Sequence, residues 1–260
     1  MAADEGEDGP GASLRDRALG KAADEFGTEI APLGREAGAV SARAVRLALR
    51  GLSHVISGAE RVYDWIEASV MERLKDVPDE ELASPSPRIA LPAIQGAVFA
   101  SEEQETPIRE MFANLIAKDM TKRGKIDVHP SFVEIVKQLS TDDAKLLLYF
   151  SQNGPQVLGE IRVSNMKTGR GYKTIGRYVS ISIGLDIEHT IRSVYSLARL
   201  GLIEINDKYP IRPEFDELEK SQLQRHDLQR FVEEGNPPKA RHDGLHLTPI
   251  GRAFVKICLY

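Results

Sequence analysis

The sequence contains very little cysteine, which limits both its chemistry and its compartment. One cysteine, Cys258, occurs among 260 residues, so no disulfide can form within the chain. Because disulfides are typical of oxidising compartments, this count favours a reducing, cytoplasmic environment. We expect Cys258 to be a small buried apolar residue in the last helix.

Long apolar runs are also missing, and no secretion signal is expected. The longest stretches without a charged residue are 89–101 and 146–159, well short of the roughly 18–20 apolar residues that span a bilayer. The first 13 residues are acidic and glycine-rich, and no basic segment there leads into an apolar run. We therefore predict no signal peptide. We expect a cytoplasmic protein whose contact with the inner membrane, if there is one, is peripheral.

The chain has no overall excess of positive charge. Its formal net charge is −5, from 34 Lys and Arg against 39 Asp and Glu. This balance argues against bulk attraction to nucleic acid, although a local basic patch stays open as an alternative. The apolar fraction of 42% and the charged fraction of 28% are typical of globular proteins, so a packed core is expected.

The N-terminal half is predicted to be helical. We expect residues 1–13 to form a disordered acidic tail, because they contain almost nothing to bury, and residues 14–140 to form a helical domain. The strongest helical signal lies in 39–74, where apolar residues recur three, four, seven or eight positions apart.

The polar face of this 39–74 helix carries three arginines, Arg43, Arg46 and Arg50. Two interpretations stay open. The segment is a packing helix with a solvated face, or it is an amphipathic helix that lies on an anionic membrane, with these arginines as the membrane contacts.

Proline and threonine mark the helix boundaries in the middle of the chain. Thr106-Pro107 and Pro130 are typical helix starts, and Pro92 suits the first turn of a helix. Asp119 falls within the apolar face of the helix that starts at 106, where a carboxylate is costly unless it is paired. We expect Asp119 to lie in a frayed final turn or to cap a neighbouring helix.

Residues 141–260 follow the element order of a winged-helix domain with an added last helix. Gly201 is predicted to end one of the helices in the left-handed conformation, and Thr248-Pro249 to start the final one. The predicted elements are, in order, a helix at 142–150, a short element at 157–163, an alternating segment at 178–183, a helix at 186–200, strands at 202–205 and 244–247, and the last helix. Between the two strands lies a 38-residue acidic insertion, 206–243, that we expect to be helical.

The predicted fold class is therefore mainly α, of the α+β type. An N-terminal helical region is followed by a winged-helix-like C-terminal domain, which carries the long helical insertion in its wing.

Six basic residues of the C-terminal domain are candidates for nucleic-acid contact. A winged helix that reads DNA needs positive charge on its recognition helix and wing. The acidic insertion opposes such binding, so we expect duplex DNA to be a less favoured partner than a protein. The candidates are Lys167, Arg170, Lys173, Arg177, Arg192 and Arg199.

No catalytic, metal or cofactor motif stands out. Residues 169–174 superficially suggest a phosphate loop, but the glycine spacing is wrong and a mobile basic loop is the better interpretation. His242 and His246 would point to the same side of a strand, yet no third ligand stands nearby. We therefore predict a protein that is not an enzyme and needs no metal or cofactor.

Several segments together resemble the Abi-alpha family of bacterial abortive infection proteins, and the helix pair around His129-Pro130-Ser131 is the most specific of them. The resemblance covers about residues 30–259. Its main segments are REMFANLIAKDM at 109–120, VHPSFVEIVKQLS at 128–140, DAKLL at 143–147, LKDVPDEEL at 74–82, LGLI at 200–203 and LTPIGRAF at 247–254.

The resemblance implies a role in anti-phage defence and leaves the mechanism open. We expect a non-enzymatic component that acts by contact with a protein or a membrane. The protein partner would come from the phage, the host or a neighbouring defence gene, and a homo-oligomer is compatible with the sequence. The alternative is a winged-helix regulator that binds nucleic acid.

Overall fold

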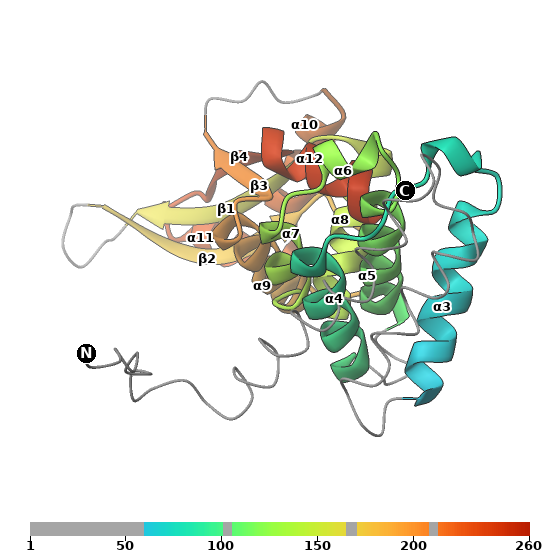
Figure 1. Ribbon diagram of the computed structural model, residues 1–260. Coiled ribbons are helices and arrows are strands. Elements are labelled where there is room, and N and C mark those ends of the chain that lie inside the picture. The colour runs from blue at the N-terminus through green and yellow to red at the C-terminus, as the bar shows by residue number, and fades with distance from the viewer. Residues whose placement is uncertain (1–59, 101–105, 165–170, 208–212) are drawn as a thin grey trace, which may run out of the picture. The chain divides into compact units, whose positions relative to one another are not determined.

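The computed structural model describes residues 60–100, 106–164, 171–207 and 213–260 (Figure 1). These residues divide into two compact units, with the boundary between Lys137 and Gln138. Helices make up the described part of the first unit, whereas the second combines helices with one antiparallel sheet.

The first unit is built around helix α5. Its elements are α3 (Glu60–Leu74), the single-turn helix η1 (Asp79–Glu81), α4 (Pro87–Phe99), α5 (Thr106–Asp119), α6 (Gly124–Asp127) and α7 (Ser131–Val136). Helix α5 packs against α3, α4 and α7. Its side chains Met111, Phe112 and Leu115 are almost completely buried, and the Phe112 ring lies directly over Gly96 of α4, where a Cβ atom would clash.

Asp119 caps a neighbouring helix, which is one of the two roles expected for it. Its carboxylate accepts a hydrogen bond of 2.5 Å from the backbone N–H of Ser86, the residue that precedes α4. Burial raises the pKa of the Asp119 carboxyl, while the Ser86 hydrogen bond and the charge of Lys125 act in the opposite direction. A buried polar group at this position is therefore paired, as its burial requires.

Two other expectations for the first unit need correction or fall outside the described residues. Pro92 was expected in a first turn, but it lies inside α4, where Pro87 occupies the first position instead. Of the predicted helix 39–74, residues 60–74 form α3. The tail 1–13 and residues 39–59, with Arg43, Arg46 and Arg50, lie outside the described part of the chain.

The second unit contains a four-stranded antiparallel sheet in the order β2-β1-β4-β3. Its elements are α8 (Thr141–Asn153), β1 (Gln156–Ser164), β2 (Tyr172–Val179), α9 (Ile187–Arg199), β3 (Ile203–Asn206), α10 (Pro213–Leu223), η3 (His226–Leu228), α11 (Gln229–Glu233), β4 (Lys239–Leu247) and α12 (Pro249–Cys258). Helix α9 packs against α8, β2 and β3, and α12 packs against α8 and β4.

The ends of these helices follow the capping signals of the sequence. Ser140 and Asp143 form a reciprocal capping box at the start of α8. Thr248 caps α12, with Pro249 in its first turn. Gly201 has φ of 72° just after α9, a conformation that disfavours any residue with a Cβ. These boundaries confirm the predicted helix starts and the predicted left-handed glycine.

The mainly helical α+β class is confirmed, but one local prediction is wrong. Residues 169–174 were interpreted as part of a mobile basic loop, whereas Tyr172, Lys173 and Thr174 begin strand β2. The short element at 157–163 is strand β1, so a β-hairpin stands between α8 and α9. Pairing with β1 explains the difference, because ladder hydrogen bonds override the turn tendency of the nearby glycines.

The insertion between β3 and β4 covers one face of the sheet. Ile161 of β1 and Tyr178 of β2 form a buried cluster with Leu228, and Leu218 and Phe231 of the insertion pack against it. Gly159 is required beneath this cluster, because a Cβ there would come within 2.0 Å of the Tyr178 ring. We call this side of the sheet the covered face.

Candidate functional site

The opposite side of the sheet carries a group of basic side chains that we call the open face. The strand register pairs Glu160 of β1 with Arg177 of β2 and with Arg241 of β4, and it pairs Arg162 with Thr174 and with Lys239. Because residues paired across antiparallel strands project to the same side, these two rows share one face. The open face is defined here by Glu160, Arg162, Tyr172, Thr174, Arg177, Lys239 and Arg241.

Glu160 is the one carboxylate within these two rows. It accepts a hydrogen bond of 2.9 Å from Nε of Arg162 and lies 3.6 Å from Nε of Arg177. The hydrogen bond from Arg162 is the main cause of a lowered pKa of the Glu160 carboxyl, with the charges of Arg162 and Arg177 adding to it. The ionised Glu160 therefore holds both arginines side by side and neutralises only part of their charge.

A β-bulge separates two residues that the sequence placed together. The register between β1 and β2 shifts between Ile161 and Arg162, so Arg177 pairs with Glu160 whereas Lys173 pairs with Val163. Without the bulge, residues four apart on a strand would share a face. Lys173 therefore lies on the covered face and Arg177 on the open face, and the two do not form one patch.

The solvent side of α9 carries a second group, with a tyrosine between two arginines. Arg192, Tyr195 and Arg199 are all exposed, and Tyr195 exposes 52% of its surface. Their spacing of three and four residues places them on one stripe of the helix. Nη1 of Arg199 also donates a hydrogen bond of 3.2 Å to the Gln138 side chain. We call these three residues the α9 stripe.

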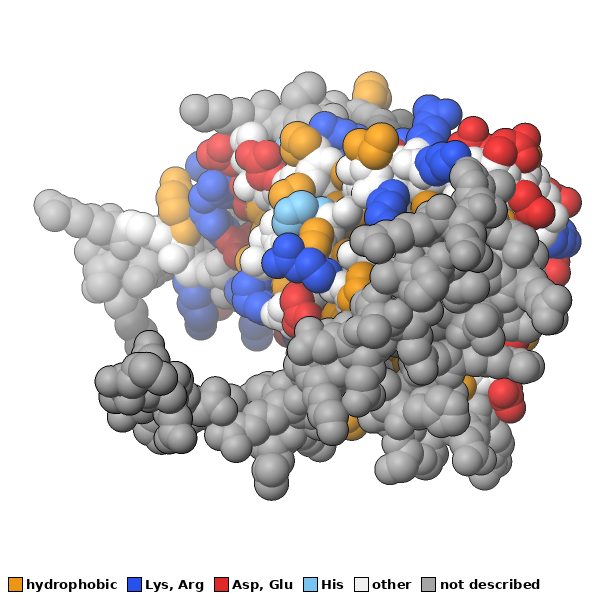
Figure 2. Space-filling view, in the orientation of Figure 1, with side chains coloured by type: hydrophobic (Ala, Val, Ile, Leu, Met, Phe, Trp, Pro, Cys, Tyr) orange, Lys and Arg blue, Asp and Glu red, His pale blue; other side chains and the backbone are white. Residues whose placement is uncertain are grey.

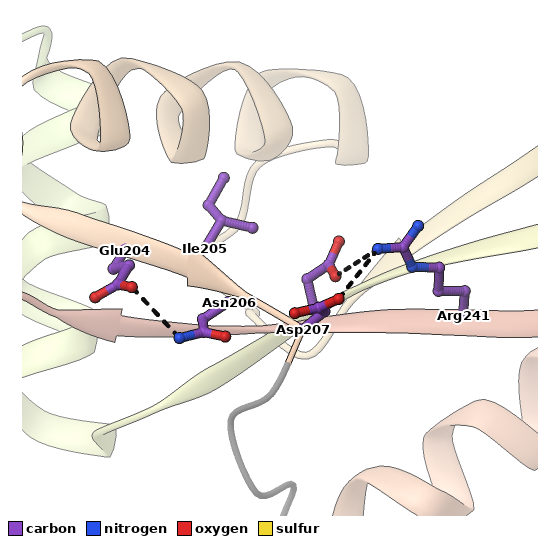
Figure 3. Close-up of a pocket in the computed structure, with 6 residues that line it drawn as sticks. Glu204, Ile205, Asn206, Asp207 and Arg241 are labelled. Atoms are coloured by element: carbon purple, nitrogen blue, oxygen red, sulfur yellow. Dashed lines mark hydrogen bonds and ion pairs between the residues drawn. The ribbon is translucent and has the colours of Figure 1, made fainter.

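An open depression of about 510 Å³ borders the open face at Arg241, where β3 leaves β4 (Figure 3). Arg241 reaches toward Asp207 and Asp243, at 3.7 and 3.6 Å. Glu204 accepts a hydrogen bond of 3.4 Å from the Asn206 side chain. Three carboxylates and one guanidinium line the depression and give it a negative balance, which opposes the binding of phosphate groups.

The covered face contains a small polar cluster under the insertion. Nδ1 of His242 lies 2.7 Å from a carboxylate oxygen of Glu219 in α10, and the Tyr178 hydroxyl donates a 3.3 Å hydrogen bond to the same oxygen. Asn236, near the end of the insertion, exchanges two hydrogen bonds with the backbone of Ser164. The contacts of Glu219 hold α10 against the covered face of the sheet, and those of Asn236 hold the end of the insertion against β1.

The two histidines that the sequence singled out lie on the same side of β4, as expected, but they contact different acidic residues. His242 contacts Glu219, whereas Nε2 of His246 lies 3.3 Å from Glu204. Among the described residues there is no group of three or more His, Cys, Asp or Glu side chains arranged to hold a metal ion.

The first unit presents acidic rather than basic side chains at the turn between α3 and α4. Figure 2 shows carboxylates gathered at the upper right of the molecule, over this turn. Asp76, Asp79, Glu80 and Glu81 are all exposed there. Elsewhere in this unit Arg73 contacts Glu110 and Asn114, and the Arg109 guanidinium lies 4.7 Å from the centre of the Trp65 ring. These arginines serve to pack the helices together.

The candidate residues from the sequence therefore fall into three groups. Arg177 lies on the open face, Arg192 and Arg199 lie on the α9 stripe, and Lys173 lies alone on the covered face. Lys167 and Arg170 belong to the residues whose structure is not described. Sequence reasoning missed Arg162, Lys239 and Arg241, because only the strand register brings them beside Arg177.

The described residues form an α+β protein with a helical unit and a unit that contains the sheet. The second unit presents two surface patches, the open face and the α9 stripe. No helix among the described residues is long and apolar enough to cross a membrane. The family model named abortive infection alpha matches residues 58–258. The chain belongs to this abortive infection family, as the segments around residues 109–147 indicated.

Other comparisons add less. A solved structure of an uncharacterized protein from the marine bacterium Alcanivorax borkumensis SK2 is similar at 18% sequence identity. That similarity covers 50% of this chain and 92% of the other, with a TM-score of 0.33. No curated protein matches the chain.

Proposed function

We propose that this chain is a non-enzymatic component of abortive infection that acts by binding a protein partner through the α9 stripe. Membership of the abortive infection family supports the defence role. The observation that carries the mode of action is the exposure of Tyr195 between Arg192 and Arg199 on a well-packed helix. Tyrosine and arginine are enriched among the residues that dominate protein–protein binding.

The surroundings of the α9 stripe favour rigid presentation. The buried side of α9 contains Ile191, Val194 and Leu197, and the helix packs against α8, β2 and β3. Asp186 caps its first turn by accepting a hydrogen bond from the His189 backbone. A side chain on such a helix loses little further freedom on binding, which favours affinity. The partner is expected to be a phage protein, a host protein or the product of a neighbouring defence gene.

The winged-helix interpretation of the second unit belongs to this proposal. Helix α9, strand β3, strand β4 and helix α12 occur in the order of that fold, and α9 takes the place of the recognition helix. The segment 207–238, which connects β3 to β4, then stands in the wing. A winged-helix regulator would place Arg192 and Arg199 on DNA phosphates. Both functions would therefore use the α9 stripe, one to bind a protein and the other to bind DNA.

The affinity for duplex DNA and its dependence on salt distinguish these two alternatives. Duplex binding through several arginines weakens steeply with salt, because each phosphate contact releases counterions. We expect this chain to bind duplex DNA no more tightly than the roughly micromolar, non-specific level of general phosphate contacts. Nanomolar, sequence-specific binding abolished by Arg192→Ala would make the regulator the better function.

Peripheral membrane contact is a further part of the proposal and rests on Arg43, Arg46 and Arg50. Basic residues beside an apolar stripe bind anionic lipid surfaces, and salt weakens that binding. Flotation with phosphatidylglycerol vesicles at low salt tests it. Recovery of all the protein in the unbound fraction would limit the 39–74 segment to packing.

The experiment that tests the defence role is a plating assay. The chain is expressed in a susceptible bacterium together with its native gene neighbours, and plaques are counted for a broad panel of phages. We expect at least a ten-fold loss of plaques for some phages relative to the same genes without this chain. Unchanged plating across the panel would contradict the proposal.

A further inference from the structure

We infer that the open face is a binding site for single-stranded nucleic acid, separate from the α9 stripe. The inference rests on what the strand register brings together on one side of β2, β1 and β4. Four cationic side chains and one exposed tyrosine share that side, and this arrangement fits a phosphate backbone with an unstacked base.

The geometry of the open face is set by neighbouring strands. Arg177, Arg162 and Lys239 come from β2, β1 and β4, which lie side by side in the sheet. Adjacent strands are about 4.8 Å apart, so these three cations lie on strands that together span about 10 Å. They form a band across the strands, and the β-bulge next to Arg162 contributes to it by turning Arg177 and Thr174 to the same face.

The charge balance of the band is positive. Arg162 and Arg177 share the single carboxylate of Glu160, and Lys239 makes none of the ion pairs described for this chain. The fourth cation, Arg241, faces Asp207 and Asp243 at the edge of the sheet. These two carboxylates border the site, so the ligand is expected to follow Arg177, Arg162 and Lys239 and to avoid the depression beyond Arg241.

Tyr172 supplies the feature that favours a single strand over other polyanions. It pairs with Ser164 and so lies on the open face, one row beyond Thr174 and Arg162, and 61% of its surface is exposed. Bases of single-stranded nucleic acid stack on such aromatic side chains next to a basic track. A duplex keeps its bases stacked inside, so Tyr172 would contribute little to duplex binding.

The acidic insertion does not block this site. Glu219 of α10 contacts His242 and Tyr178 on the covered face, and α10 packs against β1 and β4. The sheet therefore stands between α10 and the open face. The carboxylate of Glu219 therefore faces the covered side, and of the described carboxylates only those of Asp207 and Asp243 border the open face, beside Arg241.

The test is a fluorescence anisotropy titration of the full chain with labelled 20-nucleotide oligo(dT) and with a 20-base-pair duplex. We expect oligo(dT) to bind at least ten-fold more tightly at 50 mM salt. Each phosphate contact contributes about 0.7 to the log–log salt slope for single strands, so the double variant Arg177→Ala/Lys239→Ala should flatten the slope by about 1.4. Tyr172→Ala should weaken binding by roughly ten-fold.

Matched controls keep the outcome clear. Lys220 is exposed on α10 and pairs with Glu217, so Lys220→Ala removes a cation from the insertion and should leave oligo(dT) binding unchanged. Circular dichroism checks that each variant is folded, and Tyr172→Phe should retain binding. Equal affinity for duplex, no oligo(dT) binding at 50 mM salt, or an unchanged slope in the double variant would overturn the inference. The inference would also be overturned if the double variant lost binding to phosphatidylglycerol vesicles but kept its binding to oligo(dT).

Discussion

Arg177 and Tyr178 are consecutive residues of the same strand, yet they belong to surfaces with opposite roles. Tyr178 is 3% exposed, lies over Gly159 and takes part in the cluster that holds the insertion. Arg177 exposes 44% of its side chain and shares Glu160 with Arg162. The covered face thus contributes stability through close packing, while the open face presents charge to solvent. The side that carries the open face is also packed at the far end of the strands, where Leu158 and Leu245 are buried. The alternation of a β-strand is enough to keep the two apart.

The difference between the two faces should be largest in the free energy of unfolding of their alanine variants. Tyr178→Ala removes a buried ring and is expected to cost roughly 3–5 kcal/mol of the free energy of unfolding. Arg177→Ala removes one partner of an exposed ion pair, so its cost is expected to stay within about 1 kcal/mol. Urea unfolding followed by far-UV circular dichroism measures both. Similar losses for the two variants would contradict the division of the sheet into a packed and an open face.

A pair of glycines sharpens the comparison within the covered face. In Gly159→Ala the new Cβ would lie within 2.0 Å of the Tyr178 ring, so we expect a loss of about 1–3 kcal/mol. In Gly176→Ala the nearest atom would be Cδ1 of Ile161 at 3.5 Å, an ordinary contact. The second substitution should change the unfolding midpoint little. The prediction fails if Gly176→Ala is the more harmful of the two.

Alkaline pH should lower the stability of the folded protein by a smaller amount, through its buried tyrosines. Burial raises the pKa of Tyr178 above its usual range, and the charge and hydrogen bond of Glu219 add to this. In the first unit, burial raises the pKa of Tyr63 to about 12 from 10.0. Because the folded protein favours the neutral phenols, this stabilisation is complete below pH 10 and is lost as pH rises above it.

For Tyr63 the expected loss is about 1 kcal/mol by pH 11. Unfolding measured from pH 8 to pH 11 should therefore show a fall that Tyr63→Phe reduces and that Tyr178→Phe reduces as well. A pH profile that none of the buried-tyrosine variants changes would show that these phenols do not drive the alkaline loss.

The comparison of the two faces also explains what the sequence could predict. Helix boundaries depend on local signals, and Ser140, Gly201 and Thr248 carry these signals in their side chains or backbone. The family segments around 109–147 likewise lie in continuous stretches. The fold class and most of the helices of the second unit could therefore be predicted from sequence.

Sheet register depends instead on pairing between distant residues. The patch of Arg162, Arg177 and Lys239 exists only because β1 pairs with β2 on one side and with β4 on the other. Strand β4 begins at Lys239, inside the span 206–243 that was predicted to be an insertion, so only residues 207–238 connect β3 to β4. The bulge beside Arg162 has no clear signature in the sequence, and it is what separates Lys173 from Arg177. The side of the sheet on which the acidic insertion packs depends on the same distant pairing, so the sequence could not predict it.

Substitution of the α9 stripe should have the smallest effect on the free energy of unfolding and the largest effect on function. Arg192, Tyr195 and Arg199 are exposed, so the triple alanine variant of the α9 stripe is expected to unfold within about 1 kcal/mol of the parent. Loss of an exposed aromatic anchor and two arginines should nevertheless abolish partner binding. Lys256→Ala, at an exposed position on α12, is the matched control for surface substitution.

The most direct measurement is therefore the plating efficiency of a sensitive phage on cells that carry the native operon with this triple variant. We predict that the folded variant, present at the level of the parent chain, restores plaque counts to those of cells lacking the gene, while Lys256→Ala protects like the parent. Full protection by the triple variant would contradict the claim that this protein acts through the α9 stripe.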